Sequence, residues 1–357
     1  MGMIRSCLPL LVAAGLGMEP APTRFVVHEW GTFTSVVGED GVPIAWHPLE
    51  QPRDLPGFVY VGTPKGRLAA TIRMETPVLY FYSDHDVDAS VRVDFPGGQI
   101  TEWYPVARWE PRRPSRLEWT SVRVRPGAAG RLPREMADAR YYRARQTDST
   151  PVSVGGAEVA QEEKFLFYRG VGTRALPLSV LLLGDAVEVR GAAEVGPLAL
   201  FESRGGRAGY RIQDLAGGET VVDRPVLGDS LSGLREKLQS MLVERGLYPR
   251  EAAAMLATWD DSWFEDGLRL FYILPPEDTD LLLPLSIDPE PQDRARVLVA
   301  RIEILTPEME REAEQRIATS RTPIPGGRFR EALLRRVRDR TEDPRVRVRI
   351  GRLLGRP

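Results

Sequence analysis

The stretch that decides the fold is Arg-Phe-Val-Val-His-Glu-Trp-Gly-Thr-Phe-Thr-Ser-Val-Val, residues 24–37. Valine, threonine and aromatic residues dominate it, and these residue types are enriched in β-strands. Similar short runs, separated by proline and glycine, recur at residues 77–83, 90–95, 99–104, 116–125, 164–168, 178–183, 198–203 and 208–213. Several short strands at this spacing favour an antiparallel sandwich or barrel over a sheet whose strands alternate with helices.

The pattern becomes helical near Gly228. Helices are predicted at about residues 230–245 and 250–259, because leucine, methionine and alanine recur there at helical spacing. Strand-like runs then return at residues 268–274, 281–287 and 296–305. We therefore expect an α+β, β-rich fold. Its expected parts are a signal peptide at residues 1–21, a sandwich-like β-rich domain at 22–225, a smaller α+β domain at 226–320 and an Arg-rich helical tail at 321–357.

The first 21 residues have the pattern of an export signal. Arg5 supplies the positive charge, residues 7–16 are apolar, and cleavage is expected before Met18 or after Ala21. An apolar run of about ten residues is too short to span a bilayer core, which needs about 20. Cleavage would remove Cys7, the only cysteine, so the mature chain would hold no disulfide. We expect an extracytoplasmic protein, periplasmic or secreted, without a transmembrane segment; the alternative is a buried N-terminal helix.

Composition excludes one class of protein and the net charge argues against another. With 42% apolar residues the chain can bury enough surface to fold, which excludes a wholly disordered protein. A formal net charge of −2 argues against a nucleic-acid-binding protein. The charge is nevertheless unevenly distributed, because residues 327–357 contain eleven arginines and four acidic residues. This tail either docks on the acidic remainder of the chain or contacts an anionic surface, such as phospholipid or a wall polymer.

All three histidines, His28, His47 and His85, lie in the first 85 residues. Imidazole and carboxylate groups are the usual ligands of zinc and similar divalent ions. These histidines, with Asp86, are therefore the predicted metal ligands. A bound ion would turn water into a hydroxide nucleophile, so metal-assisted hydrolysis is the reaction class that we expect. The alternative is that the three histidines bind no metal and are either hydrogen-bonded or exposed.

Two glutamates are candidates for the general base in such a reaction. Glu29 follows His28 directly, but on a strand their side chains point to opposite faces. Glu75 precedes an apolar run, and a polar residue at that position is expected to have a partner such as Arg73 or Arg92.

Tryptophans suggest a different function. Five of the seven, at positions 30, 46, 103, 109 and 119, lie in the first 120 residues, and four of these have a glutamate neighbour. Tryptophan faces stack on sugar rings, and paired carboxylates hydrolyse glycosidic bonds when they are held about 5–10 Å apart. The alternative is that these tryptophans fill a sandwich core. A second expected function is thus a non-catalytic binding protein for cell-wall polysaccharide or a partner protein.

Four segments resemble those of a family. They are His-Glu-Trp-Gly-Thr-Phe-Thr-Ser at residues 28–35, Met-Glu-Thr-Pro-Val-Leu-Tyr-Phe-Tyr at 74–82, Lys-Phe-Leu-Phe-Tyr-Arg-Gly-Val-Gly at 164–172 and Ser-Trp-Phe-Glu-Asp-Gly-Leu-Arg-Leu-Phe-Tyr-Ile-Leu-Pro at 262–275. Together they resemble an uncharacterised group of exported bacterial proteins. The resemblance implies that residues 24–310 are one evolved unit to which the Arg-rich tail is added, and it implies no activity.

Overall fold

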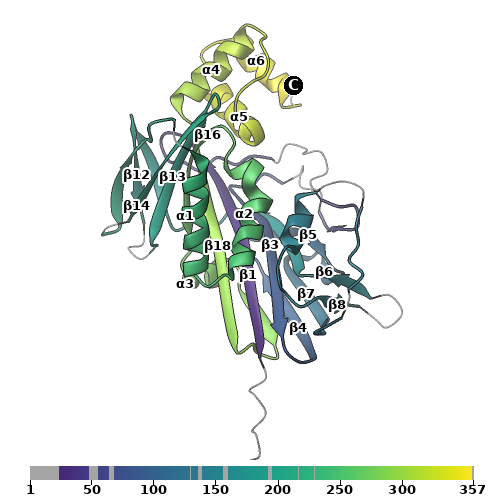
Figure 1. Cartoon of the computed structure of the whole chain (residues 1–357). Helices are drawn as coiled ribbons and strands as arrows, with labels where there is room; N and C mark the ends of the chain where they lie inside the picture. The colour runs from purple at the N-terminus through teal and green to yellow at the C-terminus, as the bar shows by residue number, and fades with distance from the viewer. Residues whose placement is uncertain are drawn as a thin grey trace, which may run out of the picture.

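The structure is a computed structural model. It describes residues 24–47, 55–63, 68–128, 130–135, 139–155, 160–191, 195–215, 217–228 and 230–355. The signal peptide expected at residues 1–21 lies outside the described residues. The fold is α+β and β-rich, as the sequence predicts, with one large sheet, two smaller sheets and two groups of helices (Figure 1).

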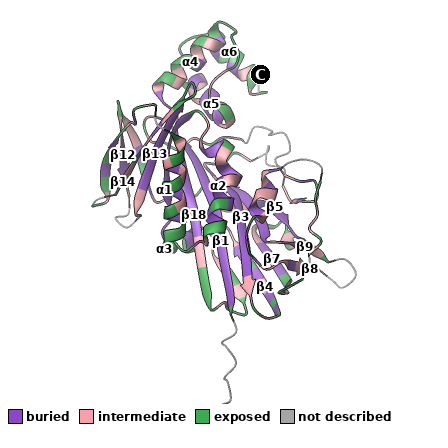
Figure 2. Ribbon diagram, viewed as in Figure 1, coloured by how far each residue is buried: buried purple, intermediate pink, exposed green. Residues whose placement is uncertain are grey.

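A nine-stranded mixed sheet runs through the centre of the molecule, with the strand order β14-β13-β16-β18-β1-β3-β10-β5-β2. The central strand β1 (Phe25–Val37) pairs in parallel with β18 (Asp293–Ile304) and antiparallel with β3 (Ile72–Ser83). All 13 residues of β1 are buried, because both faces of the sheet are covered (Figure 2). Any polar side chain on β1 therefore needs a partner inside the protein.

Two strands of this sheet come from the region that was expected to form a separate domain. The other members of the sheet are β14 (Arg207–Asp214), β13 (Pro197–Arg204), β16 (Gly267–Ile273), β10 (Leu166–Gly172), β5 (Gly98–Tyr104) and β2 (Tyr60–Val61). The α+β domain was expected at residues 226–320, yet β16 and β18 lie between β13 and β1. Strands on both sides of residue 226 therefore belong to one sheet.

Two smaller antiparallel sheets cover one face of the main sheet, which gives the predicted sandwich. The first contains β17 (Leu285–Asp288), β4 (Val87–Asp94), β7 (Arg113–Val124), β8 (Val152–Val154) and β9 (Gln161–Glu163), with β6 (Arg108–Glu110) beside β7. The second contains β11 (Ser179–Leu183), β12 (Ala186–Arg190) and β15 (Glu219–Asp223). Phe33, Leu79, Trp119 and Val189 belong to the hydrophobic core between the layers.

Helices α1 (Leu231–Glu244) and α2 (Pro249–Trp263) cover the opposite face, together with the 3-10 helix η2 (Arg140–Arg145) (Figure 1). The hydroxyl of Ser230 caps α1 by accepting a hydrogen bond from the amide of Ser232. Buried leucines at 234 and 238 follow at helical spacing and face the sheet. A short helix, α3 (Pro276–Leu282), connects β16 to β17.

The C-terminal residues form a helical group of their own at the end of the main sheet. It contains α4 (Pro307–Ala318), the 3-10 helix η3 (Gly327–Phe329), α5 (Arg330–Arg340) and α6 (Pro344–Leu353). Arg336 of α5 forms ion pairs with Glu310 of α4 and with Asp40 after β1, and Arg340 pairs with Glu310 and Glu39. These contacts confirm that the Arg-rich tail docks on acidic residues of the body.

The tryptophans are mostly core residues. Six of the seven are at most 7% exposed, and Trp109, the exception, stacks on Trp103 at a ring distance of 5.3 Å. The prediction that they fill a sandwich core is confirmed for Trp103 and Trp119, and Trp109 packs against the same core. Trp30 lies instead in the core beneath α1 and α2, and Trp46 lies in the core of the C-terminal helical group. Within the described residues, none of the helices combines the length and apolarity needed to cross a bilayer.

Candidate functional site

Charged side chains form a row on the helix-covered face of the main sheet, at the end nearest the C-terminal helices. Val297 and Val299 of β18 pack beneath α1 and α2, so Arg301 and Glu303, further along the strand, lie on the same face. We call the following residues the charged row: Arg73, Glu75, Glu102, Arg169, Arg269, Arg301 and Glu303. Arg73 is half-buried and the others are buried. Buried charges at this density need partners or a function.

A β-bulge in β3 determines which face the first members of the row take. Leu79 and Phe81 face the sandwich core, and so do Met74 and Ile72. The first two have odd numbers and the last two have even numbers, so the alternation of side chains along β3 must be interrupted between them. An extra residue in β3 causes this interruption, at the point where its pairing with β1 and β10 shifts register. The side chains at positions 73 and 75 therefore face the helices.

The bulge contains a strained residue. Thr76 has a φ of 49°, a backbone region that a β-branched residue rarely adopts. Two strands further along the sheet, the register of the β10–β5 pairing also shifts, next to Gly170. Bulges and strained residues occur preferentially beside binding and catalytic sites. The charged row thus lies in a part of the sheet with the backbone features of a functional site.

Arg269 and Glu303 form a fully buried ion pair in the row. Arg269 Nε donates to Glu303 Oε2 over 2.8 Å, and Arg269 Nη2 donates to Oε1 over 3.1 Å. The guanidinium also donates to the main-chain carbonyl oxygens of residues 263, 265 and 266. Arg269 therefore anchors the turn between α2 and β16, and this turn positions Glu265 and Asp266.

Arg301, which is also fully buried, connects this ion pair to the C-terminal segment. Its Nη2 lies 3.2 Å from Glu303 Oε2 and 3.2 Å from Glu265 Oε1. The hydroxyl of Ser262 accepts hydrogen bonds from Arg301 Nη1 over 3.3 Å and from Arg328 Nη1 over 2.6 Å. Because Arg328 belongs to η3, these bonds fix the C-terminal helices on the row.

Glu75 remains ionised in these surroundings. The hydroxyl of Thr34 donates to Glu75 Oε2 over 2.7 Å, and Arg328 Nη1 lies 3.8 Å from the same oxygen. Burial by itself raises the pKa of this carboxyl, but the positive charges of Arg328, Arg73 and Arg301 outweigh burial and lower the pKa to about 2. A carboxylate with so low a pKa is a weak base at neutral pH. The surroundings therefore do not support the general-base role expected for Glu75.

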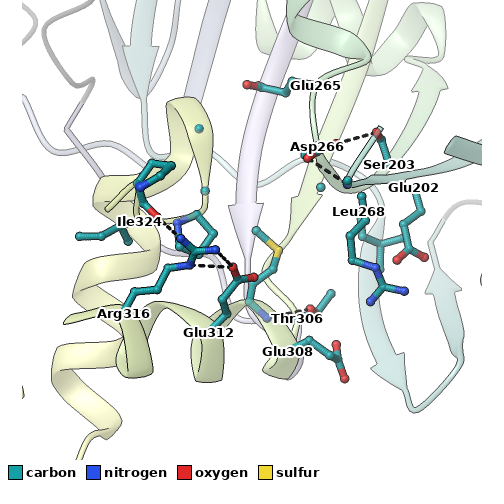
Figure 3. A pocket seen from close by; sticks show the side chains of 18 of the residues that line it. Glu202, Ser203, Glu265, Asp266, Leu268, Thr306, Glu308, Glu312, Arg316 and Ile324 are labelled. Carbon is teal, nitrogen blue, oxygen red and sulfur yellow. Dashed lines mark hydrogen bonds and ion pairs between the residues drawn. The ribbon is translucent and has the colours of Figure 1, made fainter. Parts of the chain in front are cut away.

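A cleft of about 550 Å³ opens beside the row, between the β13–β14 hairpin, the turn before β16, helix α4 and the segment before η3 (Figure 3). Five carboxylates and three arginines line it: Glu202, Glu265, Asp266, Glu308 and Glu312, with Arg204, Arg224 and Arg316. Arg224 donates two hydrogen bonds to Glu202, over 2.7 and 3.0 Å, and Arg316 pairs with Glu312 over 2.8 Å. Carboxylates remain in excess, so the cleft is acidic.

Asp266 differs from the other carboxylates of the cleft. Its Oδ1 accepts a hydrogen bond from the hydroxyl of Ser203 over 2.8 Å, and its Oδ2 accepts from the amide of Gly205 over 3.3 Å (Figure 3). Gly205 has a φ of 59°, which glycine adopts at low cost in the hairpin turn. No arginine, lysine or histidine of the described residues lies within ion-pair distance of Asp266. Two neutral donors therefore orient this carboxylate while its charge remains unneutralised.

His28 and Glu29 lie on opposite faces of β1, as predicted. His28 is 2% exposed, and its Nδ1 lies 2.7 Å from Glu251 Oε2 of α2. Glu29, on the sandwich side, is fully buried and accepts hydrogen bonds from Tyr168 and from Arg296, the latter over 2.7 Å. Glu29 thus belongs to a structural ion pair away from the cleft, and these surroundings do not support a base role either.

The other two histidines also have local partners. His47 Nδ1 lies 2.8 Å from Arg335 Nη2 and 3.4 Å from Glu331 Oε1 of α5. His85 Nδ1 lies 2.7 Å from Asp84 Oδ1 near the surface. Asp86, 71% exposed, lies 3.4 Å from Arg125. Each of these side chains is therefore held by a different part of the fold.

The predicted metal ligands are not brought together. Among the residues that the structure describes, no three histidine, cysteine, aspartate or glutamate side chains form a group that could hold a metal ion. A site shared by His28, His47, His85 and Asp86 is therefore not found in the described part of the chain. The alternative expectation, that the histidines are hydrogen-bonded or exposed, agrees with their contacts.

Sequence reasoning missed Asp266 and the buried pair of Arg269 and Glu303. A signal was present, because Arg301 and Glu303 alternate with apolar residues at 300–304, and Arg269 interrupts the apolar run at 268–273. Alternation normally indicates a face exposed to water. In this protein the C-terminal segment covers that face, and the sequences of the two strands do not predict that they are covered.

Comparisons with known proteins yield only distant similarity. No family model matches the chain, and no curated protein matches it. Among solved structures, the Fcho1 mu homology domain from Danio rerio with bound Eps15 peptide is 7% identical, with a TM-score of 0.29, over 80% of this chain and 98% of that one. The yeast delta-COP-I mu-homology domain complexed with a Dsl1 WxWxV peptide is 7% identical, with a TM-score of 0.33, over 80% of this chain and 100% of that one. TM-scores this low support no conclusion about fold or function.

Proposed function

We propose that the chain is a non-catalytic, extracytoplasmic binding protein whose cleft takes a ligand through an ammonium or guanidinium group. The observation that carries the proposal is the carboxylate of Asp266, which neutral donors hold in place in a cleft of about 550 Å³. Clefts of roughly 300–1,000 Å³ are usual for small-molecule ligands. An oriented carboxylate binds a cationic donor by charge-assisted hydrogen bonds, which are stronger than neutral ones.

The charges around Asp266 favour a cationic ligand group. The two hydrogen bonds from Arg224 neutralise Glu202, and Arg316 neutralises Glu312. Glu265 is shared with Arg301 of the charged row. A cationic group of a ligand therefore binds most favourably to the carboxylate of Asp266. An amino sugar of a wall polysaccharide and a basic side chain of a partner protein both carry such a group.

Binding is favoured over catalysis because the predicted bases are committed to other contacts. Glu75 is held ionised by the arginines around it, and Glu29 is paired with Arg296 inside the sandwich. The proposed extracytoplasmic location rests on the sequence pattern of residues 1–21.

Calorimetric titration with butylammonium tests the proposal, with 1-butanol as the uncharged probe of the same size. We expect butylammonium to bind the full chain and butanol to bind at least tenfold more weakly. Asp266→Asn keeps the side-chain shape but removes the charge, and it should raise the dissociation constant at least fivefold. Asp214→Asn is the matched control, since Asp214 lies at the opposite end of the same hairpin, paired with Pro197. Equal binding by wild type and Asp266→Asn would refute the proposal.

A further inference from the structure

The cleft beside Asp266 has an apolar part as well as a charged one. Five apolar residues line it: Leu268, Met309, Pro323, Ile324 and Pro325. Met309 and Ile324 are half-buried, so part of each side chain remains open to a ligand. Ile324 belongs to the segment before η3 and Asp266 to the turn before β16, so the two contribute to different walls of the cleft (Figure 3). A ligand that fills the cleft therefore joins its cationic group to an apolar body.

An amino sugar fits this lining poorly. Sugar-binding sites commonly stack an aromatic side chain on the sugar ring, and none of the described residues that line the cleft is aromatic. The hydroxyl groups of a sugar would also lose water against the apolar residues without gaining a hydrogen bond from them, which is unfavourable. Lysine has a different chemistry, because four methylene groups carry its ammonium group. This stem is the longest apolar one among the basic side chains, so it matches the apolar part of the cleft best.

The main chain of Ile324 favours a peptide as the ligand. This residue lies between two prolines and outside helices and strands, and a residue before proline is biased towards an extended conformation. Among the described residues, neither the N–H nor the carbonyl oxygen of Ile324 forms a hydrogen bond. An extended main chain with a free donor and a free acceptor can pair with an extended peptide. A cleft of about 550 Å³ is large enough for a lysine side chain and the main chain next to it.

We infer that the ligand of the cleft is a peptide segment that presents a lysine. Asp266 binds the ammonium group of this lysine, the apolar residues of the cleft contact its methylene stem, and Ile324 pairs with the main chain beside it. The excess of carboxylates in the cleft favours the same ligand, because the lysine adds a positive charge and the peptide main chain adds none. This inference rests on the proposed function, since it requires the cation site at Asp266.

Calorimetric titration of the full chain with four probes tests the inference. Nα-acetyl-lysine methylamide is the peptide probe, and butylammonium is the same side chain without the main chain. Nα-acetyl-norleucine methylamide lacks the charge, and glucosamine represents the amino sugar. At pH 6, where all three amines are charged, the lysine probe should bind at least fivefold more tightly than butylammonium. It should bind at least tenfold more tightly than the norleucine probe or glucosamine.

Met309→Gln tests the contact with the methylene stem, since glutamine has a similar length and is also a good helix former. It should weaken binding of the lysine probe at least threefold. Leu281→Gln is the control, because Leu281 is 58% exposed on α3 and does not line the cleft. This variant should bind the lysine probe as wild type does. Equal binding by wild type and Met309→Gln would contradict the contact with the stem.

The probes separate failure of this inference from failure of the proposed function. If butylammonium binds and glucosamine binds as tightly as the lysine probe, the ligand is not a lysine peptide, although the cation site stands. A lysine probe that binds no more tightly than butylammonium would overturn the pairing with a peptide main chain and would also leave the cation site intact. If none of the three cations binds, the proposed cation site is wrong and this inference fails with it.

Discussion

Arg269 and Glu303 lie directly opposite each other on β16 and β18, with Arg269 Nε 2.8 Å from Glu303 Oε2 and both side chains at most 1% exposed. The same guanidinium holds the turn that carries Glu265 and Asp266. The ion pair therefore connects the stability of the sheet to the geometry of the cleft.

Replacement of Glu303 by glutamine should be strongly destabilising. Arg269 would remain charged and fully buried without its carboxylate, and losing one partner of a buried ion pair costs about 3–5 kcal/mol. Urea unfolding monitored by tryptophan fluorescence measures the loss. Glu312→Gln is the control, because that carboxylate is 50% exposed in a pair within one helix, and its loss should cost less than about 1 kcal/mol. Similar losses for the two variants would show that the Arg269–Glu303 pair is not a major source of stability.

Glu75 should make the protein sensitive to acid. Its pKa is about 2 in the folded state against 4.5 for the ordinary group, so its contribution to stability is present above about pH 4.5. The contribution is lost as the pH falls from about 4.5 to 2, because the unfolded chain then binds the proton more readily. A shift of this size corresponds to roughly 3 kcal/mol.

The variant Glu75→Gln isolates this effect. It should be less stable than wild type at pH 7, and the difference should shrink steadily between pH 5 and pH 2. Thermal unfolding across this range provides the measurement. A difference in stability that stays constant with pH would mean that the carboxyl of Glu75 has an ordinary pKa in the folded protein.

The backbone at Thr76 should favour glycine over alanine. With φ at 49°, alanine keeps the unfavourable conformation, whereas glycine adopts it at low cost. We expect Thr76→Gly to be more stable than Thr76→Ala by about 1 kcal/mol, the reverse of the usual order in a strand. Chemical denaturation of the two variants decides between these orders. The usual order, with alanine more stable, would show that the bulge carries no strain at this residue.

The docking of the C-terminal helices should depend on Arg336. This side chain is 9% exposed and contacts Glu310 and Asp40, which lie on α4 and after β1. Arg336→Ala should therefore increase hydrogen exchange in α5 and α6 about tenfold without changing exchange in β1. Arg338→Ala is the matched control on the same helix, since among the described residues Arg338 pairs with its neighbour Asp339 alone. Unchanged exchange in the Arg336 variant would mean that apolar packing alone holds the tail.

Local features of the fold could be predicted from the sequence, and long-range ones could not. Residues 24–37 predict a strand that the structure places at Phe25–Val37, and the helix predicted near 230–245 lies at Leu231–Glu244. Composition and spacing suffice for such elements. The parallel pairing of β1 with β18 was not predictable, because the partner lies more than 250 residues away and only tertiary packing selects it.

For the candidate site too, local features could be predicted from the sequence and long-range contacts could not. The sequence predicts a partner for Glu75, and the positive charge of Arg73 does lower the pKa of this carboxyl. The other expected partner, Arg92, instead lies 3.5 Å from Asp94 on β4. The histidines are few and lie close together in the sequence, yet each is held by a different element. Closeness in sequence says little about closeness in space once the strands have crossed the sheet.

The proposed cation site is tested most directly by the amide signal of Gly205, whose N–H donates to Asp266. In ¹⁵N–¹H correlation spectra, butylammonium should shift this signal with the same dissociation constant that calorimetry gives. The shift should be lost in Asp266→Asn and kept in Asp214→Asn. A Gly205 amide that stays unchanged while butylammonium saturates the wild-type protein would contradict the proposal, because the ligand would then bind elsewhere.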